Sequence, residues 1–244
     1  MLAQQRQPSA DALLLVQDEA RDGEKVTAFY SRFISPGNTV FDIGANHGNR
    51  TEIFSQLADT VVAVEPQLRL LDKFKLYPNV HIVEKAVGAA ANSAEMMVSN
   101  FPSVGSLSPH WVAAVKQSGR FPQCNWDKRR TVEMTTLDAL IEEYGKPAFI
   151  KIDVEGFESE VLRGLSQAVA ALSIEFTPEF AEATYCSIKR LLALGNYEFN
   201  WDFRETFSMP WDGWMGEGEV LRDLSRFSGD NIAYGDVYAR LKAA

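Results

Sequence analysis

An apolar strand that runs directly into a glycine-containing turn is the feature that most constrains how this chain folds. Residues 39–43 (TVFDI) lead into Gly44-Ala45-Asn46-His47-Gly48, and a helix-compatible segment follows. Glycine lets the backbone turn sharply and approach a ligand closely, and the first N–H groups of the next helix can meet a polar group of that ligand. This order predicts a parallel sheet with a nucleotide pocket at its edge.

A second apolar run, 61–64, ends in Glu65, 21 residues after Gly44. An ionised carboxylate at this place suits a ribose diol, because it accepts hydrogen bonds from both hydroxyls. The alternative is that Asp42 and Glu65 only cap helices. The combination of an apolar strand, a glycine turn and a carboxylate after the second strand favours the ligand pocket.

The bulk properties fit a single soluble enzyme-sized domain. The chain has 244 residues and a net charge of -9, which argues against bulk attraction to nucleic acid or anionic membranes. Two cysteines and three dispersed histidines predict neither a zinc site nor a disulfide framework, so a cytoplasmic setting is expected. No apolar run approaches the ~20 residues of a membrane span.

Strand and helix patterns alternate along the chain and predict an α/β fold in which parallel strands are joined by right-handed crossovers. Residues 10–33 show helical spacing with a break at Asp22-Gly23, and Asp138 is expected to cap a short helix that ends at Gly145. Further strands are expected at 80–83, 94–98, 131–137, 148–153 and 172–176, further helices at 68–76, 158–165 and 178–194, and a closing antiparallel pair at 197–203 and 232–238; residues 111–130 give no clear pattern.

Four carboxylates are expected at one rim of this sheet, because ligands bind outside the carboxyl ends of parallel strands. They are Asp42, Glu65, Asp153 and Glu175. A carboxylate-rich rim repels a pyrophosphate but suits a ligand with a sulfonium and an ammonium group, as in S-adenosylmethionine. The rim therefore favours a methyl donor over NAD.

Lys151 is unusual in a strand that should be covered on both faces. It would share one side with Asp153 and Glu155 if extended geometry persists that far. A buried lysine is costly unless it is paired or opens onto a cleft. A structural ion pair and a catalytic or substrate-holding role remain equally open for it.

The motifs VFDIGANHGNRT (40–51), VVAVEPQ (61–67), AVG (86–88), TLDAL (136–140) and FIKIDVEGFE (149–158) together resemble the FkbM family of S-adenosylmethionine-dependent methyltransferases. The resemblance covers roughly residues 38–178, and FIKIDVEGFE is its most specific part. It implies a class I methyltransferase (Rossmann-like) fold: a seven-stranded, mostly parallel sheet with helices on both faces and the last strand antiparallel. It also implies O-methylation of a hydroxyl on a sugar, glycoside, polyketide or other secondary metabolite.

The resemblance also assigns the donor site. The methionine end would lie on the Gly44–Gly48 turn beside Asp42, Glu65 would hold the ribose, and Asp153 would lie near the donor amino group or the acceptor. The donor-binding residues implied are Asp42, Gly44, Ala45, Asn46, Gly48, Thr51, Glu65, Pro66, Ala86, Val87 and Asp153, with Ala86 and Val87 beside the adenine.

Methyl transfer is an in-line displacement, so the acceptor oxygen must be aligned and its proton removed. Asp153 and Glu155 are the first candidates for the base, then Glu175, with His47 and His110 behind them. Three close carboxylates could instead bind Mg²⁺, which would lower the pKa of an acceptor hydroxyl. The Ser103–Ser108 loop either lines the pocket or is an ordinary polar turn.

The chain is expected to form one domain: a helical cap (1–37), a donor-binding core (38–178) and a C-terminal part (179–244). Aromatic residues crowd segment 199–214, where they either stack on a flat acceptor or close the core. Partners are expected to be a small hydroxylated acceptor, without nucleic acid or membrane, and the oligomeric state stays open. Two other functions stay open: a NAD-type oxidoreductase and a donor-binding module without turnover. The first turn argues against the oxidoreductase, because it lacks the Gly-x-Gly-x-x-Gly motif.

Overall fold

The computed structural model of the protein describes residues 23–242. The part of the expected N-terminal helices that precedes Gly23 lies outside the described residues. The strands described are β1 (Thr39–Ile43), β2 (Thr60–Val64), β3 (Val80–Val83), β4 (Ala86–Val87), β5 (Ser93–Val98), β6 (Lys128–Thr135), β7 (Phe149–Ile152), β8 (Ala171–Phe176), β9 (Tyr197–Phe203) and β10 (Gly235–Leu241). The α-helices described are α2 (Gly23–Tyr30), α3 (Asn49–Leu57), α4 (Pro109–Ser118), α5 (Leu137–Tyr144), α6 (Glu158–Arg163), α7 (Ala181–Leu194) and α8 (Glu217–Leu224). The 3₁₀ helices are η1 (Leu68–Leu76), η2 (Pro102–Val104), η3 (Pro178–Phe180) and η4 (Ser225–Phe227).

Seven strands form the main sheet in the order β3-β2-β1-β7-β8-β10-β9. Strands β3, β2, β1, β7 and β8 are parallel, whereas β10 is antiparallel to both β8 and β9. The chain order reverses between β1 and β7, which places the topological switch point at the carboxyl ends of these two strands. The expected α/β class I methyltransferase architecture is confirmed.

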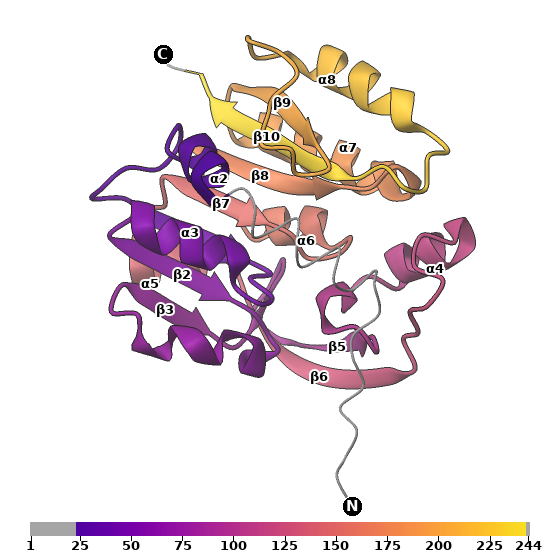
Figure 1. Cartoon of the computed structure of the whole chain (residues 1–244), viewed down its shortest axis with the longest axis horizontal. Coiled ribbons are helices and arrows are strands. Elements are labelled where there is room, and N and C mark those ends of the chain that lie inside the picture. Colours follow the sequence, from indigo (N-terminus) through magenta and orange to yellow (C-terminus); the bar gives the residue numbers. More distant parts are fainter. Residues whose placement is uncertain (1–22, 243–244) are drawn as a thin grey trace, which may run out of the picture.

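The two faces of the main sheet differ in polarity. One face, covered by α5, α6 and α7, is apolar and includes Phe41, Ile150 and Ile174. The other face, covered by α2 and α3 (Figure 1), carries a continuous row of polar side chains across five strands. This row consists of Asp42, Lys151, Ser173, Tyr238 and Asn200, all of them at most 3% exposed. Burial of so many polar groups on one sheet face is costly unless they are paired, so this face is where function is expected.

A second sheet, in the order β4-β6-β5, was not foreseen. It branches from the main sheet after β3 and carries α4, which lies on the side toward which the parallel strands point (Figure 1). The apolar cluster beneath α4 contains Trp111 and Trp126, and the Trp126 indole N–H donates to the carbonyl of Val104 at 2.7 Å. Residues 86–135, which contain the second sheet and α4, are called the insertion. They form one wall at the carboxyl edge of the main sheet.

Several local expectations need correction. Thr136, and not Asp138, caps α5, because its hydroxyl accepts a hydrogen bond from the N–H of Ala139 at 3.1 Å. Asp138 instead accepts from the N–H of Ser166 at 2.9 Å. The stretch 68–76 is a 3₁₀ helix, the final strand is shifted to 235–241, and two α-helices (α4 and α8) occupy regions without a helical prediction. Each difference involves a short segment whose conformation depends on its tertiary neighbours.

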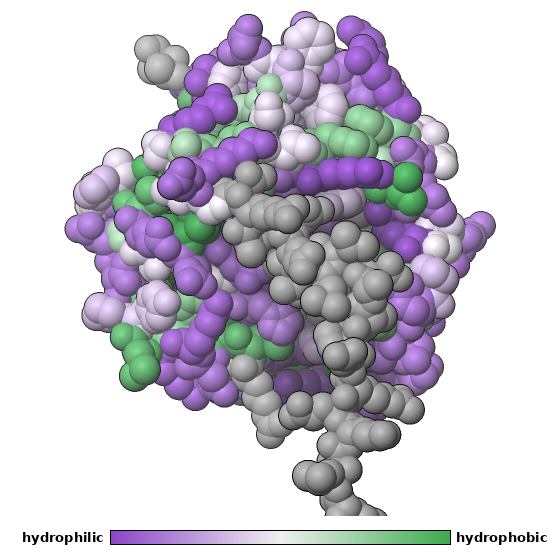
Figure 2. Space-filling model, in the orientation of Figure 1, coloured by the Kyte–Doolittle hydropathy of each residue, from purple (hydrophilic) through white to green (hydrophobic). Residues whose placement is uncertain are grey.

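Figure 2 shows that hydrophilic side chains predominate among the described residues on this face of the molecule, in keeping with the net charge of -9. Within residues 23–242, no helix is both long and apolar enough to cross a membrane.

Candidate active site

The turn after β1 is held tightly against its neighbours. The N–H groups of Gly44 and Ala45 both donate to the carbonyl of Val64, at 2.9 and 3.0 Å. Gly44, Asn46 and Gly48 all have left-handed backbone conformations, with φ of 80°, 49° and 76°. A Cβ at Gly44 would overlap the carbonyl oxygen of Asp153, so glycine is required where the turn approaches the end of β7. The Gly44–Gly48 turn and the end of β7 are thus adjacent.

Carboxylates anchor this turn from both sides. Asp42 is buried and accepts a hydrogen bond from the Thr51 hydroxyl at 2.6 Å. Glu65 accepts from the N–H groups of Asn46 (3.1 Å) and Gln67 (2.9 Å), one on each carboxylate oxygen. Burial raises the pKa of both carboxyl groups. The Oδ1 atom of Asn46 is buried without a hydrogen-bond partner among the described residues, so it is available to accept a hydrogen bond.

The remaining donor-side candidates follow β2 and β3. Pro66 is half-buried directly after Glu65. Ala86 and Val87 form β4, are at most 7% exposed, and pair with β6 at Met134 and Thr135. They lie beyond the end of β3, on the carboxyl side of the sheet.

The four catalytic candidates come together at the ends of β7 and β8. Lys151 is 3% exposed, and its Nζ forms an ion pair with Oδ2 of Asp153 at 2.6 Å. Oxygen atoms of Asp153, Glu155 and Glu175 all lie within 4.8 Å of one another. The structure therefore brings together all the residues that the sequence selected for catalysis. The same three carboxylates have a spacing that could also hold a divalent cation.

Electrostatics at this cluster are dominated by burial and like charge. Desolvation raises the pKa of Glu155 and of Glu175 well above the ordinary value, and the neighbouring carboxylates raise both further. For Lys151, burial lowers the pKa, but Asp153 and Asp236 outweigh it and raise the pKa above its ordinary value. The lysine therefore stays charged, while Glu155 and Glu175 bind a proton more tightly than ordinary carboxyl groups do.

Two residues outside the sequence hypothesis support the β7 turn. The carboxylate of Glu158 accepts from the N–H groups of Val154 and Gly156, both at 3.1 Å. The hydroxyl of Ser106, which is 1% exposed, donates to the carbonyl of Glu155 at 2.6 Å. An acid placed to cap a turn could have drawn attention to Glu158, whereas no local signal connects Ser106 with a residue 49 positions away.

A third residue missed from sequence is Asp236 on β10. It is 3% exposed and is paired in register with Glu175, so its side chain lies on the polar sheet face. Burial raises the pKa of Asp236 to about 7, against the opposing effect of Lys151. Its strand could be recognised from sequence, but not its position beside Lys151, because that depends on the antiparallel return of the chain.

The lower-ranked candidates lie at the surface. His47 and His110 are exposed, and His110 is in the first turn of α4, not on a loop. Among the aromatic residues of segment 199–214, Phe207 and Trp214 pack against the apolar cluster under α2. Trp211 is 47% exposed, and its indole N–H donates to Asp223 at 2.7 Å. The packing favours the core-closing interpretation of this segment.

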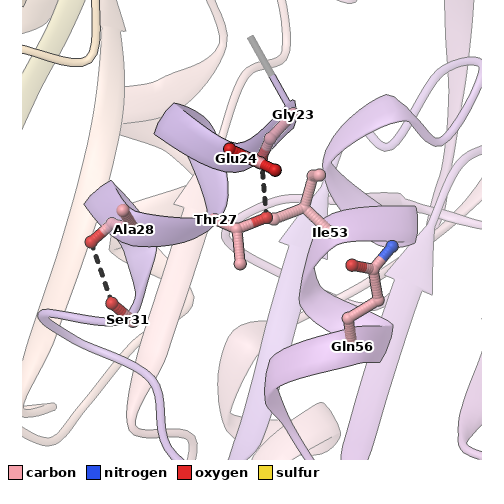
Figure 3. A pocket seen from close by; sticks show the side chains of 7 residues that line it. All are labelled: Gly23, Glu24, Thr27, Ala28, Ser31, Ile53 and Gln56. Atoms are coloured by element: carbon pink, nitrogen blue, oxygen red, sulfur yellow. Dashed lines mark hydrogen bonds between the residues drawn. The ribbon is translucent and has the colours of Figure 1, made fainter.

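A separate hollow of about 570 Å³ lies between α2 and α3 (Figure 3). Its polar side chains include Thr27 and Ser31, whose hydroxyls donate to carbonyls of α2 at 2.7 and 2.8 Å. These two hydroxyls already have main-chain partners. The hollow does not include the strand-end carboxylates.

The description "Methyltransferase FkbM domain" belongs to a family model that matches residues 42–204, about two thirds of the chain. The chain belongs to this family. The match includes the donor turn, Glu65, the insertion and the β7 and β8 ends. FkbM membership and the fold together make the protein an S-adenosylmethionine-dependent methyltransferase.

Solved structures add only distant likenesses. A methyltransferase FkbM from Methylobacillus flagellatus KT is 13% identical, with 94% of this chain and 60% of that chain covered and a TM-score of 0.46. A precorrin-6y C5,15-methyltransferase from Geobacter metallireducens GS-15 is 11% identical, with 93% and 87% covered and a TM-score of 0.47. SMU.1697c from Streptococcus mutans, a putative methyltransferase in complex with SAH, is 12% identical, with 90% and 97% covered and a TM-score of 0.42. No curated protein matches the chain significantly.

Proposed function

We propose that this FkbM-family protein transfers a methyl group from S-adenosylmethionine to a hydroxyl of a small molecule such as a sugar, glycoside or secondary metabolite. The observation that carries the proposal is the group of three carboxylates, Asp153, Glu155 and Glu175, at the ends of β7 and β8, where the main chain of Asp153 lies against Gly44. An oxygen nucleophile must lose a proton on methylation, and a carboxylate with a raised pKa is suited to accept it. We also propose that one domain, with the boundaries expected from sequence, carries both the donor and the acceptor site.

The donor would be held by the turn and by the ends of β1 and β2. The buried Asn46 Oδ1 has no partner among the described residues, and each Glu65 oxygen accepts only one main-chain hydrogen bond. Glu65 would thus retain lone pairs for the ribose hydroxyls, and Asn46 would receive a donor from the ligand. The ligand supplies an electrophilic methyl group on a sulfonium. Asp42 and Thr51, which bond to each other, would support the turn from beneath.

The acceptor would lie against the three carboxylates. Lys151 forms a 2.6 Å ion pair with Asp153, while Glu155 and Glu175 have raised pKa values. We assign separate roles within this cluster: Asp153 orients a polar group of the donor or acceptor, and Glu155 or Glu175, in its ionised form, accepts the hydroxyl proton, because its raised pKa gives it a higher proton affinity. Alignment of the oxygen behind the methyl group supplies much of the rate.

The first test is binding and turnover of the purified chain. Calorimetry should show binding of S-adenosylhomocysteine and no binding of NAD. Labelled S-adenosylmethionine is then offered to sugars, glycosides and polyketide alcohols, with amines and an RNA transcript as other acceptor classes. Methylation of an alcohol supports the proposal; transfer only to nitrogen or RNA, or donor binding with silence across the panel, contradicts it. A parallel series with EDTA tests whether the carboxylates act through Mg²⁺.

Asp153→Asn tests the roles within the cluster. The substitution removes the charge that pairs with Lys151 but keeps a hydrogen-bond acceptor, so the variant should fold with reduced stability and lose about 100-fold or more in kcat. Glu160→Gln, an acid-to-amide change at a partly exposed position on α6, is the matched control and should keep full activity. Unchanged turnover in Asp153→Asn would remove Asp153 from the mechanism.

A further inference from the structure

The Ser103–Ser108 loop is the sequence feature that the proposed function leaves unused. Ser106 does not line a pocket, because it is 1% exposed. Its hydroxyl faces the turn between β7 and α6, where it donates to the carbonyl of Glu155 at 2.6 Å. This buried hydroxyl therefore links the Ser103–Ser108 loop to a turn that is distant in sequence.

Hydrogen bonds fix both the main chain and the side chain of Ser106. Its main chain forms a two-bond bridge with Met97 of β5, with N···O distances of 2.8 and 3.0 Å. Its Oγ also accepts a hydrogen bond from the N–H of Ser108 at 2.9 Å. Because the N–H of Ser108 occupies an acceptor position, the hydroxyl proton is directed toward the Glu155 carbonyl.

The turn that receives this hydrogen bond has an uncommon backbone. Glu155 has φ of 55°, a left-handed conformation that a non-glycine residue adopts only when its surroundings hold it there, and Gly156 follows with φ of 87°. Glu158 binds the N–H groups on either side, at Val154 and Gly156. Ser106 binds the carbonyl between them, so the peptide groups around Glu155 are fixed from two directions.

The orientation of this backbone decides where the Glu155 carboxylate points. That carboxylate lies within 4.8 Å of Asp153 and Glu175, although like charge opposes such a grouping. We propose that Ser106 is a positioning residue of the methyltransferase, which holds the left-handed Glu155 backbone so that its carboxylate stays in the acceptor cluster. The inference rests on the proposed function for the role of Glu155, but the geometric part stands independently.

Ser106→Ala is the direct test, and Ser99→Ala is its matched control. Ser99 is also a buried serine of the same insertion, and its Oγ accepts from the N–H of Phe101 at 3.1 Å. Ser106→Ala should lower kcat by about 10- to 100-fold, since a misplacement of about 1 Å has effects of this size. The dissociation constant of S-adenosylhomocysteine should not change, and Ser106→Thr, which restores a hydroxyl, should recover part of the loss. Ser99→Ala should match the parent in kcat.

Crystal structures of both variants with S-adenosylhomocysteine provide a readout that needs no acceptor. In Ser106→Ala the Glu155 carboxylate should move away from Asp153 and Glu175, whereas in Ser99→Ala it should stay. An unmoved carboxylate, or a moved one with unchanged kcat, overturns the positioning role. A parent protein that methylates none of the offered alcohols refutes the proposed function instead, and the crystal comparison still decides whether Ser106 positions Glu155.

Discussion

Lys151 is 3% exposed, yet it keeps its charge, because Asp153 lies 2.6 Å away and Asp236 is close enough to raise its pKa as well. A buried lysine without such partners would lose its proton or destabilise the fold. At the scale of single residues, desolvation and charge pairing therefore act in opposite directions on the ionisable groups of the site. Burial raises the pKa of Glu155 and of Glu175, whereas Asp153 is paired with the ammonium group of Lys151.

A second single residue, Glu65, is expected to bind the donor, so Glu65→Ala should weaken donor binding. The substitution removes a carboxylate that also fixes the N–H groups of Asn46 and Gln67. Loss of the ribose hydrogen bonds should raise the dissociation constant of S-adenosylhomocysteine by about tenfold or more, measured by calorimetry. Glu24→Ala on the exposed side of α2 is the control. A dissociation constant for S-adenosylhomocysteine equal to that of the parent protein would reject Glu65 as a ribose ligand.

Asp236→Asn should change how stability depends on pH. The pKa of Asp236 in the folded protein is raised to about 7 from 3.8, so the folded state binds the proton more tightly than the unfolded state does. Its contribution to stability is thus fully present below the unfolded pKa and is lost as the pH rises through about 7.

The amide of Asp236→Asn is neutral at every pH and should escape this loss. The variant should resemble the parent at acidic pH and gain relative to it by roughly 2–4 kcal/mol above neutrality, as urea unfolding across pH would show. Asp212→Asn, an exposed change, serves as the control. A stability difference that does not grow with pH would contradict the raised pKa of Asp236.

At the scale of elements, the β7–α6 turn shows which details a sequence can reveal. The motif FIKIDVEGFE placed the strand, the turn and the helix correctly, because an apolar run, a glycine and acidic first-turn residues are local signals. The partners of the turn could not be found in the same way. Ser106 and Trp111 reach it from the insertion, and that insertion includes α4, in a region whose mixed composition gave no helical pattern.

Gly156→Ala should destabilise the protein much more than a second left-handed glycine does. Both Gly156 and Gly145 have φ of 87°, but a Cβ at Gly156 would overlap the Trp111 side chain, while one at Gly145 meets nothing within 4 Å. Gly145→Ala should cost about 1–2 kcal/mol for the backbone alone. Gly156→Ala should cost about 3 kcal/mol or more, because a packed indole must shift. Equal urea midpoints for the two variants would contradict this packing.

At the scale of the whole molecule, the insertion is locked to the C-terminal half. Arg120 follows α4 and forms a two-pronged ion pair with Glu179, just after β8. It also donates to the carbonyl of Ala233 at 2.6 Å, and Asn231 donates to the carbonyl of Ser118 at 2.7 Å. These contacts join the wall of the site formed by α4 to the loop that precedes β10.

Arg120→Met should therefore have a large effect on stability. It leaves Glu179, whose side chain is only 11% exposed, without its cationic partner, at a cost of about 3 kcal/mol. Arg163→Met is the matched control, because Arg163 is 65% exposed and pairs with Glu160 on the surface, which is worth at most about 1 kcal/mol. Thermal or urea unfolding compares them. Similar losses in both would show that the Arg120 contact does not secure the insertion.

The sequence by itself determined the α/β architecture, the glycine turn after β1 and the acidic strand ends, because each depends on residues adjacent in the chain: an apolar run, a glycine where φ is positive, and a side chain directly after a strand. Only the tertiary structure decided which distant groups share the site. Asp236 reaches Lys151 through the antiparallel return of β10, and Ser106 reaches Glu155 through a sheet that branches from the core. The physical reason is that burial, register and charge pairing arise from contacts between segments far apart in sequence, which no local pattern encodes.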